Sequence, residues 1–238
     1  MPHSLEAPGT DQAPEWSGLY RARGDEVVPQ RPIFTGDVFF GVTVIGEEEP
    51  KNVLVLQHPC VIRRGIELTP KLLVAEVAAA ARIMPSKWAD GFMRQLPLAE
   101  LVPEDSPADF AAFFDRHHLI LRAGLNLDRR VAAMSQSGVN LLMQRWVHHN
   151  SRVVVPTQDY QTATSAQFDE ADIIEEWCID REDDGVTLTE ANVEIDAWLA
   201  GDASQASSRR SRLGDPQQRS AVRRELRAQL GNVRRGGG

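Results

Sequence analysis

The chain has 238 residues, of which 42% are hydrophobic, so it is long enough for one good domain with appendages or for two small domains. A formal net charge of −8 argues against a protein that binds nucleic acid over its whole surface. No apolar run reaches the roughly 18 to 20 residues that span a bilayer, and residues 1–31 do not read as a signal peptide. Two cysteines, Cys60 and Cys178, are too few for a disulfide framework and favour a reduced, cytoplasmic protein.

The charges are distributed unevenly. Between residues 168 and 202 there are thirteen acidic residues and a single basic one, Arg181. From Arg209 onwards nine arginines face only Asp215 and Glu225. The two blocks can pair with each other, or the basic tail can reach an anionic partner. We expect residues 203–238 to form a solvated, flexible tail with too little apolar surface to join the core.

The first third of the chain reads as a loose arm followed by strands. Residues 1–31 are rich in proline, glycine and charge, which predicts an N-terminal arm. Residues 36–45 alternate as in a strand, with a bulge or bend indicated at Gly41. An acidic turn at 47–50 leads to a second strand over 53–56. The apolar face of the first strand is predicted to consist of Val38, Phe40, Val42 and Val44.

Residues 71–81 carry conflicting signals. Thr69-Pro70 and the run of alanines favour a helix, because threonine caps helices and proline is tolerated at their first position. The alternation of side chains and the neighbouring strands favour a strand. We predict a strand over 71–77, and residues 88–101 are expected to return along the same sheet.

Four helices are predicted in the second half of the chain, with a short extended piece at 152–156 and a polar linker at 203–208. The pattern of Val139, Leu142, Met143, Trp146 and Val147 predicts an amphipathic helix over 136–149, capped by Ser135 or Ser137. Further helices are expected over 168–179, from a cap at Thr187 or Thr189 to Ala200, and over 215–230.

Residues 36–39, 52–56 and 73–77 together resemble the MazF/PemK-like toxins, which are small SH3-like barrels that cleave RNA and are held inactive by an antitoxin. Residues 127–135 and the helix over 138–149 look like the closing strand and helix of that family. The resemblance covers roughly 35–149. It implies an α+β fold in which an SH3-like β-barrel with its closing helix occupies 32–155. An acidic helical extension (156–202) and the basic tail (203–238) follow the barrel.

The chain departs from that family at two positions that carry the chemistry. Where the toxins have an arginine at the start of the second strand, this chain has Lys51-Asn52, and lysine cannot fork around a phosphate as arginine does. Where they have a hydroxyl at the end of the third strand, it has Ala78 to Ala81. The resemblance therefore implies a barrel used for binding, a non-catalytic or regulatory protein in a toxin-antitoxin, phage or defence setting. Its partner would be nucleic acid or another protein, with no membrane and no cofactor, and a homodimer is left open.

A second hypothesis is an active endoribonuclease that uses Lys51, His58 and Arg63 or Arg64. Arg63, Arg64, Arg129, Arg130 and Arg145 could line a basic groove for phosphate, although surface charge paired with nearby acids is the interpretation we favour.

A third hypothesis is a thiol-dependent enzyme centred on Cys60, with His58 and the nearby arginines lowering the pKa of the thiol. The structural interpretation, which we favour, makes Cys60 a small buried hydrophobic residue and His58 the end of a strand. No metal is expected, because His58 and Cys60 supply only two of the four ligands of a structural zinc.

Overall fold

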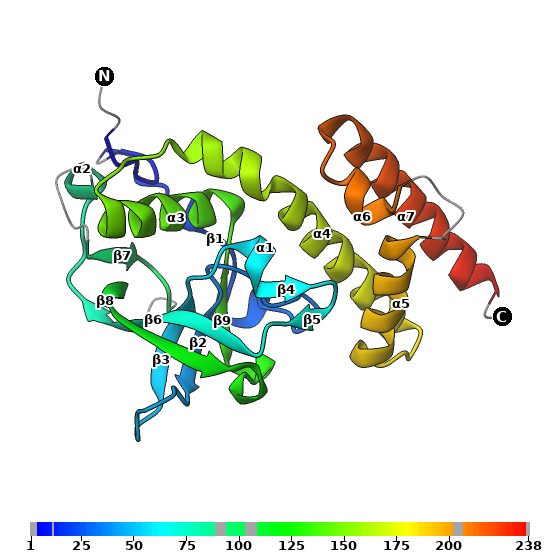
Figure 1. Ribbon diagram of the computed structural model, residues 1–238, viewed down its shortest axis with the longest axis horizontal. Helices are drawn as coiled ribbons and strands as arrows, with labels where there is room; N and C mark the ends of the chain where they lie inside the picture. Colours follow the sequence, from blue (N-terminus) through cyan, green and yellow to red (C-terminus); the bar gives the residue numbers. More distant parts are fainter. Residues whose placement is uncertain (1–3, 11, 89–93, 103–108, 202–206, 237–238) are drawn as a thin grey trace. The chain divides into compact units, whose positions relative to one another are not determined.

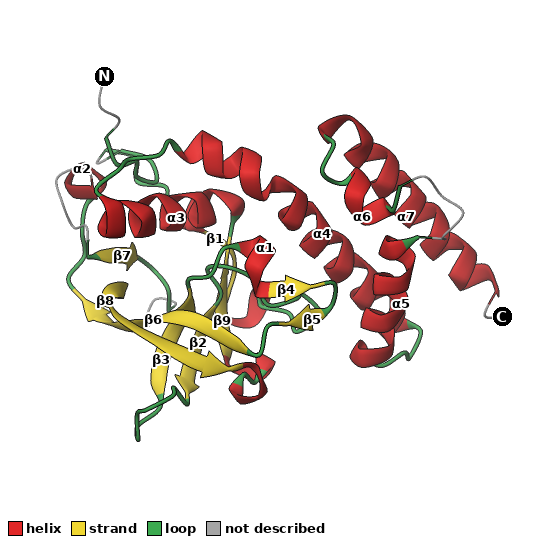
Figure 2. Ribbon diagram, viewed as in Figure 1, coloured by secondary structure: helices red, strands yellow, loops and turns green. Residues whose placement is uncertain are grey.

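The computed structural model describes residues 4–10, 12–88, 94–102, 109–201 and 207–236 (Figure 1). The chain divides into two compact units. The first consists of Met1–Val27, Ile33–Ile62 and Leu68–Ala163, and the second of Val28–Pro32, Arg63–Glu67 and Thr164–Gly238. The fold is α+β: the first unit contains a seven-stranded antiparallel sheet, and the second is mainly helical (Figure 2).

The sheet has the strand order β1-β9-β2-β3-β6-β8-β7. Its strands are β1 (Tyr20–Arg23), β2 (Val38–Val42), β3 (Lys51–Val55), β6 (Lys71–Ala80), β7 (Gln95–Leu98), β8 (Asp109–Leu121) and β9 (Arg130–Met134). A separate two-stranded sheet is formed by β4 (Arg63–Arg64) and β5 (Glu67–Leu68). The helices are α1 (Pro59–Ile62), α2 (Pro85–Trp88), α3 (Gln136–Ser151), α4 (Thr157–Asp183), α5 (Leu188–Ala200), α6 (Arg209–Arg212) and α7 (Pro216–Gly236). Short 3₁₀ helices are η1 (Trp16–Leu19), η2 (Gly24–Glu26), η3 (Arg122–Gly124) and η4 (Leu127–Arg129).

Strand β6 confirms the strand predicted for residues 71–77 and extends it by three residues. It pairs with β3 on one side and with β8 along its whole length on the other. Pairing with β8 along the whole strand and with β3 at residues 74–76 outweighs the helix propensity of its alanines. Of the expected return over 88–101, residues 95–98 form β7, and residues 89–93 lie outside the described part of the chain.

One face of the sheet, which we call the core face, carries a buried apolar cluster. Its members from the sheet strands are Phe39, Val42, Val53, Val55, Leu72, Val74 and Ile120. On the opposite face, His117 pairs with Ala75, and its ring lies 6.3 Å from that of Trp146 on α3. Helix α3 therefore covers this second face, the helix face (Figure 2).

The predicted apolar face of the first strand is wrong at two positions. Phe39, not Val38 or Phe40, joins Val42 and Val44 in the core cluster. The register between β2 and β3 shifts between Phe39 and Val42, and Gly41 has a positive φ of 66°. The bulge predicted at Gly41 is thus confirmed, and it reverses the alternation of side chains along this strand.

The sheet is curved but open. Ile45, which follows β2, donates a backbone hydrogen bond of 2.9 Å to Leu119 of β8, although β3 and β6 separate these strands in the sheet. The described strands leave β1 and β7 at the two edges of the sheet. The α+β class is confirmed, whereas the closed barrel expected over 32–155 is replaced by this open seven-stranded arrangement.

Helix α3 begins where the sequence predicted. Ser135 is the N-cap, and its side chain accepts a hydrogen bond of 3.0 Å from the backbone N–H of Gly138. Gly138 is required for packing, because a Cβ at this position would lie 2.2 Å from the carbonyl oxygen of Leu19. The helix ends at Ser151, two residues beyond the predicted end, with Arg152 in the left-handed conformation (φ 61°).

The second unit is built from the larger part of α4 together with α5, α6 and α7. Thr187 caps α5, as predicted, in a reciprocal capping box with Glu190. Helix α4 extends beyond the predicted range of 168–179 at both ends. The buried residues of this unit's core are Ile173, Ile174, Trp177, Cys178, Ala191, Ile195, Leu199, Leu213, Val222, Leu226 and Leu230.

This core corrects our expectation of a flexible tail. Leu213, Val222, Leu226 and Leu230 all lie after residue 203, and none is more than 7% exposed. Residues 202–206 lie outside the described part of the chain. The predicted helix over 215–230 is present as α7, and its apolar side chains pack inside the unit.

The acidic and basic blocks pair with each other. On α4, Asp169 lies 2.5 Å from Arg223 and Glu170 lies 3.1 Å from Arg210. Within the basic block itself, Glu225 of α7 lies 2.6 Å from Arg212 of α6. Of the two alternatives drawn from the charge pattern, the structure shows internal pairing for these arginines.

Candidate functional site

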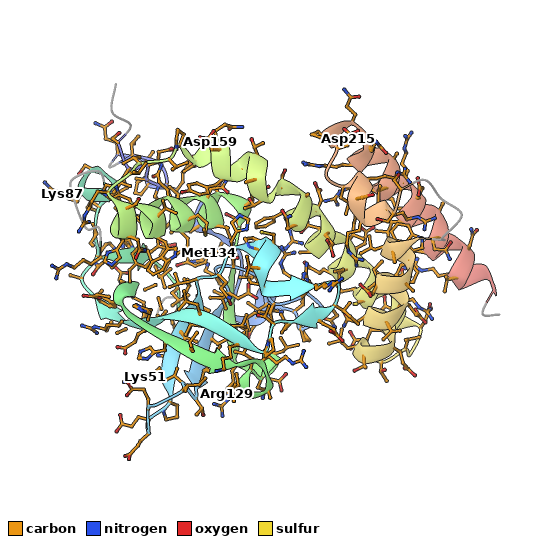
Figure 3. All side chains as sticks on the ribbon, viewed as in Figure 1. Lys51, Lys87, Arg129, Met134, Asp159 and Asp215 are labelled. Carbon is orange, nitrogen blue, oxygen red and sulfur yellow. The ribbon has the colours of Figure 1, made fainter. Side chains whose placement is uncertain are left out.

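Four ionisable side chains from three strands meet on the core face. Glu76 of β6 is at their centre. The Nζ atom of Lys51 lies 3.8 Å from its Oε2, Nη1 of Arg116 lies 3.3 Å from its Oε1, and Nε2 of His118 lies 3.7 Å from its Oε2. We call Lys51, Glu76, Arg116 and His118 the Glu76 cluster. Lys51, labelled in Figure 3, begins β3 beside the turn that follows β2.

The strand register explains why these side chains meet. Glu76 pairs with Val53, and His118 pairs with Val74, so both share the face of two core valines. Lys51 precedes Val53 by two residues and points to the same face. The cluster therefore lies next to the apolar core, on the same face of the sheet.

A bulge in β8 brings in the fourth member. Ala75 pairs with His117 but the next residue, Glu76, pairs with Phe113, so three extra residues are accommodated in β8. Arg116 is the last of these, and its guanidinium lies over the ring of Phe113, 4.5 Å from the centroid. Bulges of this kind redirect side chains near functional sites.

The cluster is partly buried and reachable from solvent. The side chains of Glu76 and His118 are 18% and 16% exposed, and that of Arg116 is 52% exposed. Nε2 of His118 is buried and has no hydrogen-bond partner within the described ranges. Such a set can accept a proton at the carboxylate, supply one from the imidazole, and hold an anion between the lysine and the arginine.

The structure places the predicted residues Lys51 and His58 apart. Lys51 is the first residue of β3, whereas His58 comes after the last, so the two do not form a pair. Nδ1 of His58 instead lies 2.9 Å from Sγ of Cys60, and burial lowers the pKa of His58. Cys60 is exposed, so its interpretation as a buried hydrophobic residue is wrong.

The five predicted arginines do not form one groove. Arg130 is buried and pairs with Asp37 at 2.9 Å. Arg145 is also buried: it donates to the carbonyl oxygen of Trp88 at 2.8 Å, and burial lowers its pKa to about 10. Neither side chain can line a surface for phosphate. The other predicted members are Arg129, which donates to the carbonyl oxygen of Gly41, and Arg63 and Arg64, which form β4 in the second unit.

Glu76, Arg116 and His118 were missed by the sequence analysis. One signal was present: Glu76 is the single charged residue in the run from Leu72 to Ala81. A charge in a strand that is otherwise apolar points to a function or to a partner, because burying it is unfavourable. His117-His118 gave no indication of which histidine faces which side.

Within the described ranges, no group of three or more His, Cys, Asp or Glu side chains is placed to hold a metal ion. The helices in those ranges include none with the length and apolar character needed to cross a bilayer. Neither a family model nor a curated protein matches the sequence. In the part of the chain that the structure describes, the Glu76 cluster brings a carboxylate, an imidazole and two cations together on one face of the sheet.

Proposed function

We propose that the chain is a nucleic-acid-binding protein with a MazF/PemK-like fold and that it cleaves RNA at the Glu76 cluster. The fold part of the proposal is supported by the curvature of β2, β3, β6 and β8. The hydrogen bond between Ile45 and Leu119 brings the chain after β2 towards β8, as in the closure of a small barrel. Helix α3 follows β9 directly, as the closing helix does in the resemblance.

The observation that carries the catalytic part is the arrangement of one carboxylate, one imidazole and two cations on a single face. Glu76 and His118 are 3.7 Å apart, and Lys51 and Arg116 flank the same carboxylate. A partly buried carboxylate beside an imidazole forms a base and acid pair. Two adjacent cations suit a phosphate, whose charge increases during displacement.

The reaction proposed is an internal transfer within RNA. Glu76 takes the proton of a ribose 2′-hydroxyl as O2′ attacks the neighbouring phosphorus. The bond from phosphorus to O5′ breaks, and the protonated imidazole of His118 gives its proton to O5′. The products are a 2′,3′-cyclic phosphate and a 5′-hydroxyl end, and Lys51 and Arg116 offset the extra negative charge on the phosphoryl oxygens.

The test compares neighbouring histidines. End-labelled RNA and its all-deoxy analogue are incubated with the purified chain in EDTA. We expect RNA alone to be cut, and Glu76→Gln or His118→Asn to reduce the rate by roughly 10²- to 10⁴-fold. His117→Asn is the matched control, because His117 lies on the helix face and should leave the rate unchanged.

Two results would contradict the proposal. One is RNA that is bound but not cut, which would leave a non-catalytic binding or regulatory protein whose Glu76 cluster holds three strands together. The other is equal loss of activity in His117→Asn and His118→Asn, which would indicate a general effect on folding. In cells, growth arrest on expression that Glu76→Gln relieves would support a toxin-like role.

A second candidate, a thiol-dependent enzyme, is favoured by the contact of 2.9 Å between His58 and Cys60. Imidazole can accept the thiol proton at this distance. Cys60→Ser would abolish such an activity and leave RNA cleavage intact. An activity that is lost in Glu76→Gln but kept in Cys60→Ser would exclude this candidate.

A further inference from the structure

The first unit contains a cavity of about 330 Å³ that the proposed function does not use. It lies between the N-terminal segment and the first turns of α3 and α4. Its polar lining includes Glu6, Glu15, Ser137, Asn140, Thr157 and Gln161. Its volume is at the lower end of the range for small-molecule sites, which suits a compact ligand.

Hydrogen bonds fix one wall of the cavity. The backbone N–H of Glu6 donates to Oε1 of Gln144 at 2.7 Å. The carboxylate of Glu6 accepts hydrogen bonds from the backbone N–H and the hydroxyl of Thr157, at 2.9 and 2.7 Å. Glu6 therefore anchors the N-terminal segment and places a carboxylate on the first backbone donor of α4, which weakens the attraction of this helix N-terminus for an external anion.

The rest of the lining favours a ligand that donates hydrogen bonds. Glu15 is exposed, and its carboxylate has no hydrogen-bond or ion-pair partner within the described ranges. Asn140 is 4% exposed, and its Nδ2 donates to Oε1 of Gln161 at 2.7 Å; its Oδ1 is buried behind the cavity wall and has no partner within the described ranges. The described lining includes two carboxylates and no lysine, arginine or histidine.

We propose that this cavity binds a small alkyl amine, with an ammonium group held by the carboxylate of Glu15. An ammonium group supplies three donors and one positive charge, which match an exposed carboxylate in a described lining that has two carboxylates and no basic side chain. A carboxylate or phosphate ligand would be repelled by Glu6 and Glu15.

The probes are 1,4-diaminobutane, succinate and 1,4-butanediol, which have the same four-carbon length and carry positive, negative and no charge. Isothermal titration of the full chain should show binding of the diamine alone. Glu15→Gln should weaken that binding about tenfold or more, because a charge-assisted contact is lost. Ser137→Phe, at an exposed helix position, should block the cavity without changing its charge.

Glu47→Gln is the control, because it removes one carboxylate from an exposed turn outside the cavity. It should bind the diamine as the parent chain does. The proposal is overturned if none of the probes binds, if all three bind alike, or if Glu47→Gln weakens binding as much as Glu15→Gln. RNA cleavage by Glu15→Gln should be unchanged, so this test is separate from that of the Glu76 cluster.

Discussion

Replacing Leu226 with alanine should destabilise the second unit strongly. Leu226 is on α7, is 0% exposed, and belongs to the core that includes Ile195 and Leu199 of α5. Leucine-to-alanine changes at fully buried positions cost about 2–5 kcal/mol. A loss of about 3 kcal/mol corresponds to a fall of roughly 12–24 °C in the midpoint of a domain of 60–100 residues.

This fall can be measured by thermal unfolding monitored by circular dichroism at 222 nm, a wavelength that reports helix content. Arg227→Ala is the matched control, because Arg227 is the next residue, is 71% exposed, and lies 4.0 Å from Glu176. An exposed ion pair of this kind contributes at most about 1 kcal/mol. If both variants shift the midpoint by the same small amount, α7 does not pack in the core of the second unit, and the basic segment is a flexible tail as the sequence predicted.

Three further results are expected. Asp37→Ala removes the partner of Arg130 from a buried ion pair, so chemical denaturation should show a loss of about 3–5 kcal/mol; an unchanged midpoint would contradict the pairing. Thiol titration should count one reactive cysteine in the native chain, the exposed Cys60, and two after denaturation, because Cys178 is buried and burial raises its pKa to about 12. The hydrogen bond from α6 lowers the pKa of Glu225, so its contribution to stability is present above the unfolded pKa and lost as the pH falls below about 4; a midpoint of the second unit that rises on acidification would refute this.

Local patterns were sufficient for the elements whose stability depends on local features. The starts of α3 and α5 were each predicted to within two residues, because a side-chain oxygen satisfies backbone donors only a few residues away; of the two candidate caps for each helix, Ser135 caps α3 and Thr187 caps α5. The strand over 71–77 was predicted from the alternation of its side chains and from the neighbouring strands, against the helix signals of Thr69-Pro70 and the alanines. These features are contained in short stretches of sequence.

Features that depend on distant pairing could not be read from the sequence. The bulge at Gly41 was predicted, but its consequence was not: Phe39, and not Phe40, faces the core cluster. A bulge shifts the alternation of side chains by one residue, so the residues on its two sides follow opposite patterns. His118 joins Glu76 only through a register that includes three extra residues in β8. Leu226 is buried in a core whose other members on α4 and α5 are far from it in the sequence.

Glu76→Leu separates a functional from a structural role of the Glu76 cluster. Glu76 pairs with the core residue Val53, so a leucine there would extend the apolar core face. The cations left behind, Lys51 and Arg116, are partly exposed and remain hydrated. The loss of one carboxylate therefore leaves no fully buried unpaired cation, and partly exposed ion pairs of this kind contribute at most about 1 kcal/mol each, which the added apolar contact can offset.

We therefore expect Glu76→Leu to keep or raise the unfolding free energy, within about 1 kcal/mol of the parent in denaturant titration, while RNA cleavage is lost. A chain that retains a carboxylate where an apolar residue would be at least as stable has a reason other than folding to keep it. A loss of about 3 kcal/mol or more would show that the carboxylate holds β3, β6 and β8 together. The proximity of Glu76 and His118 would then be explained by folding, and the argument for catalysis would lose its main support.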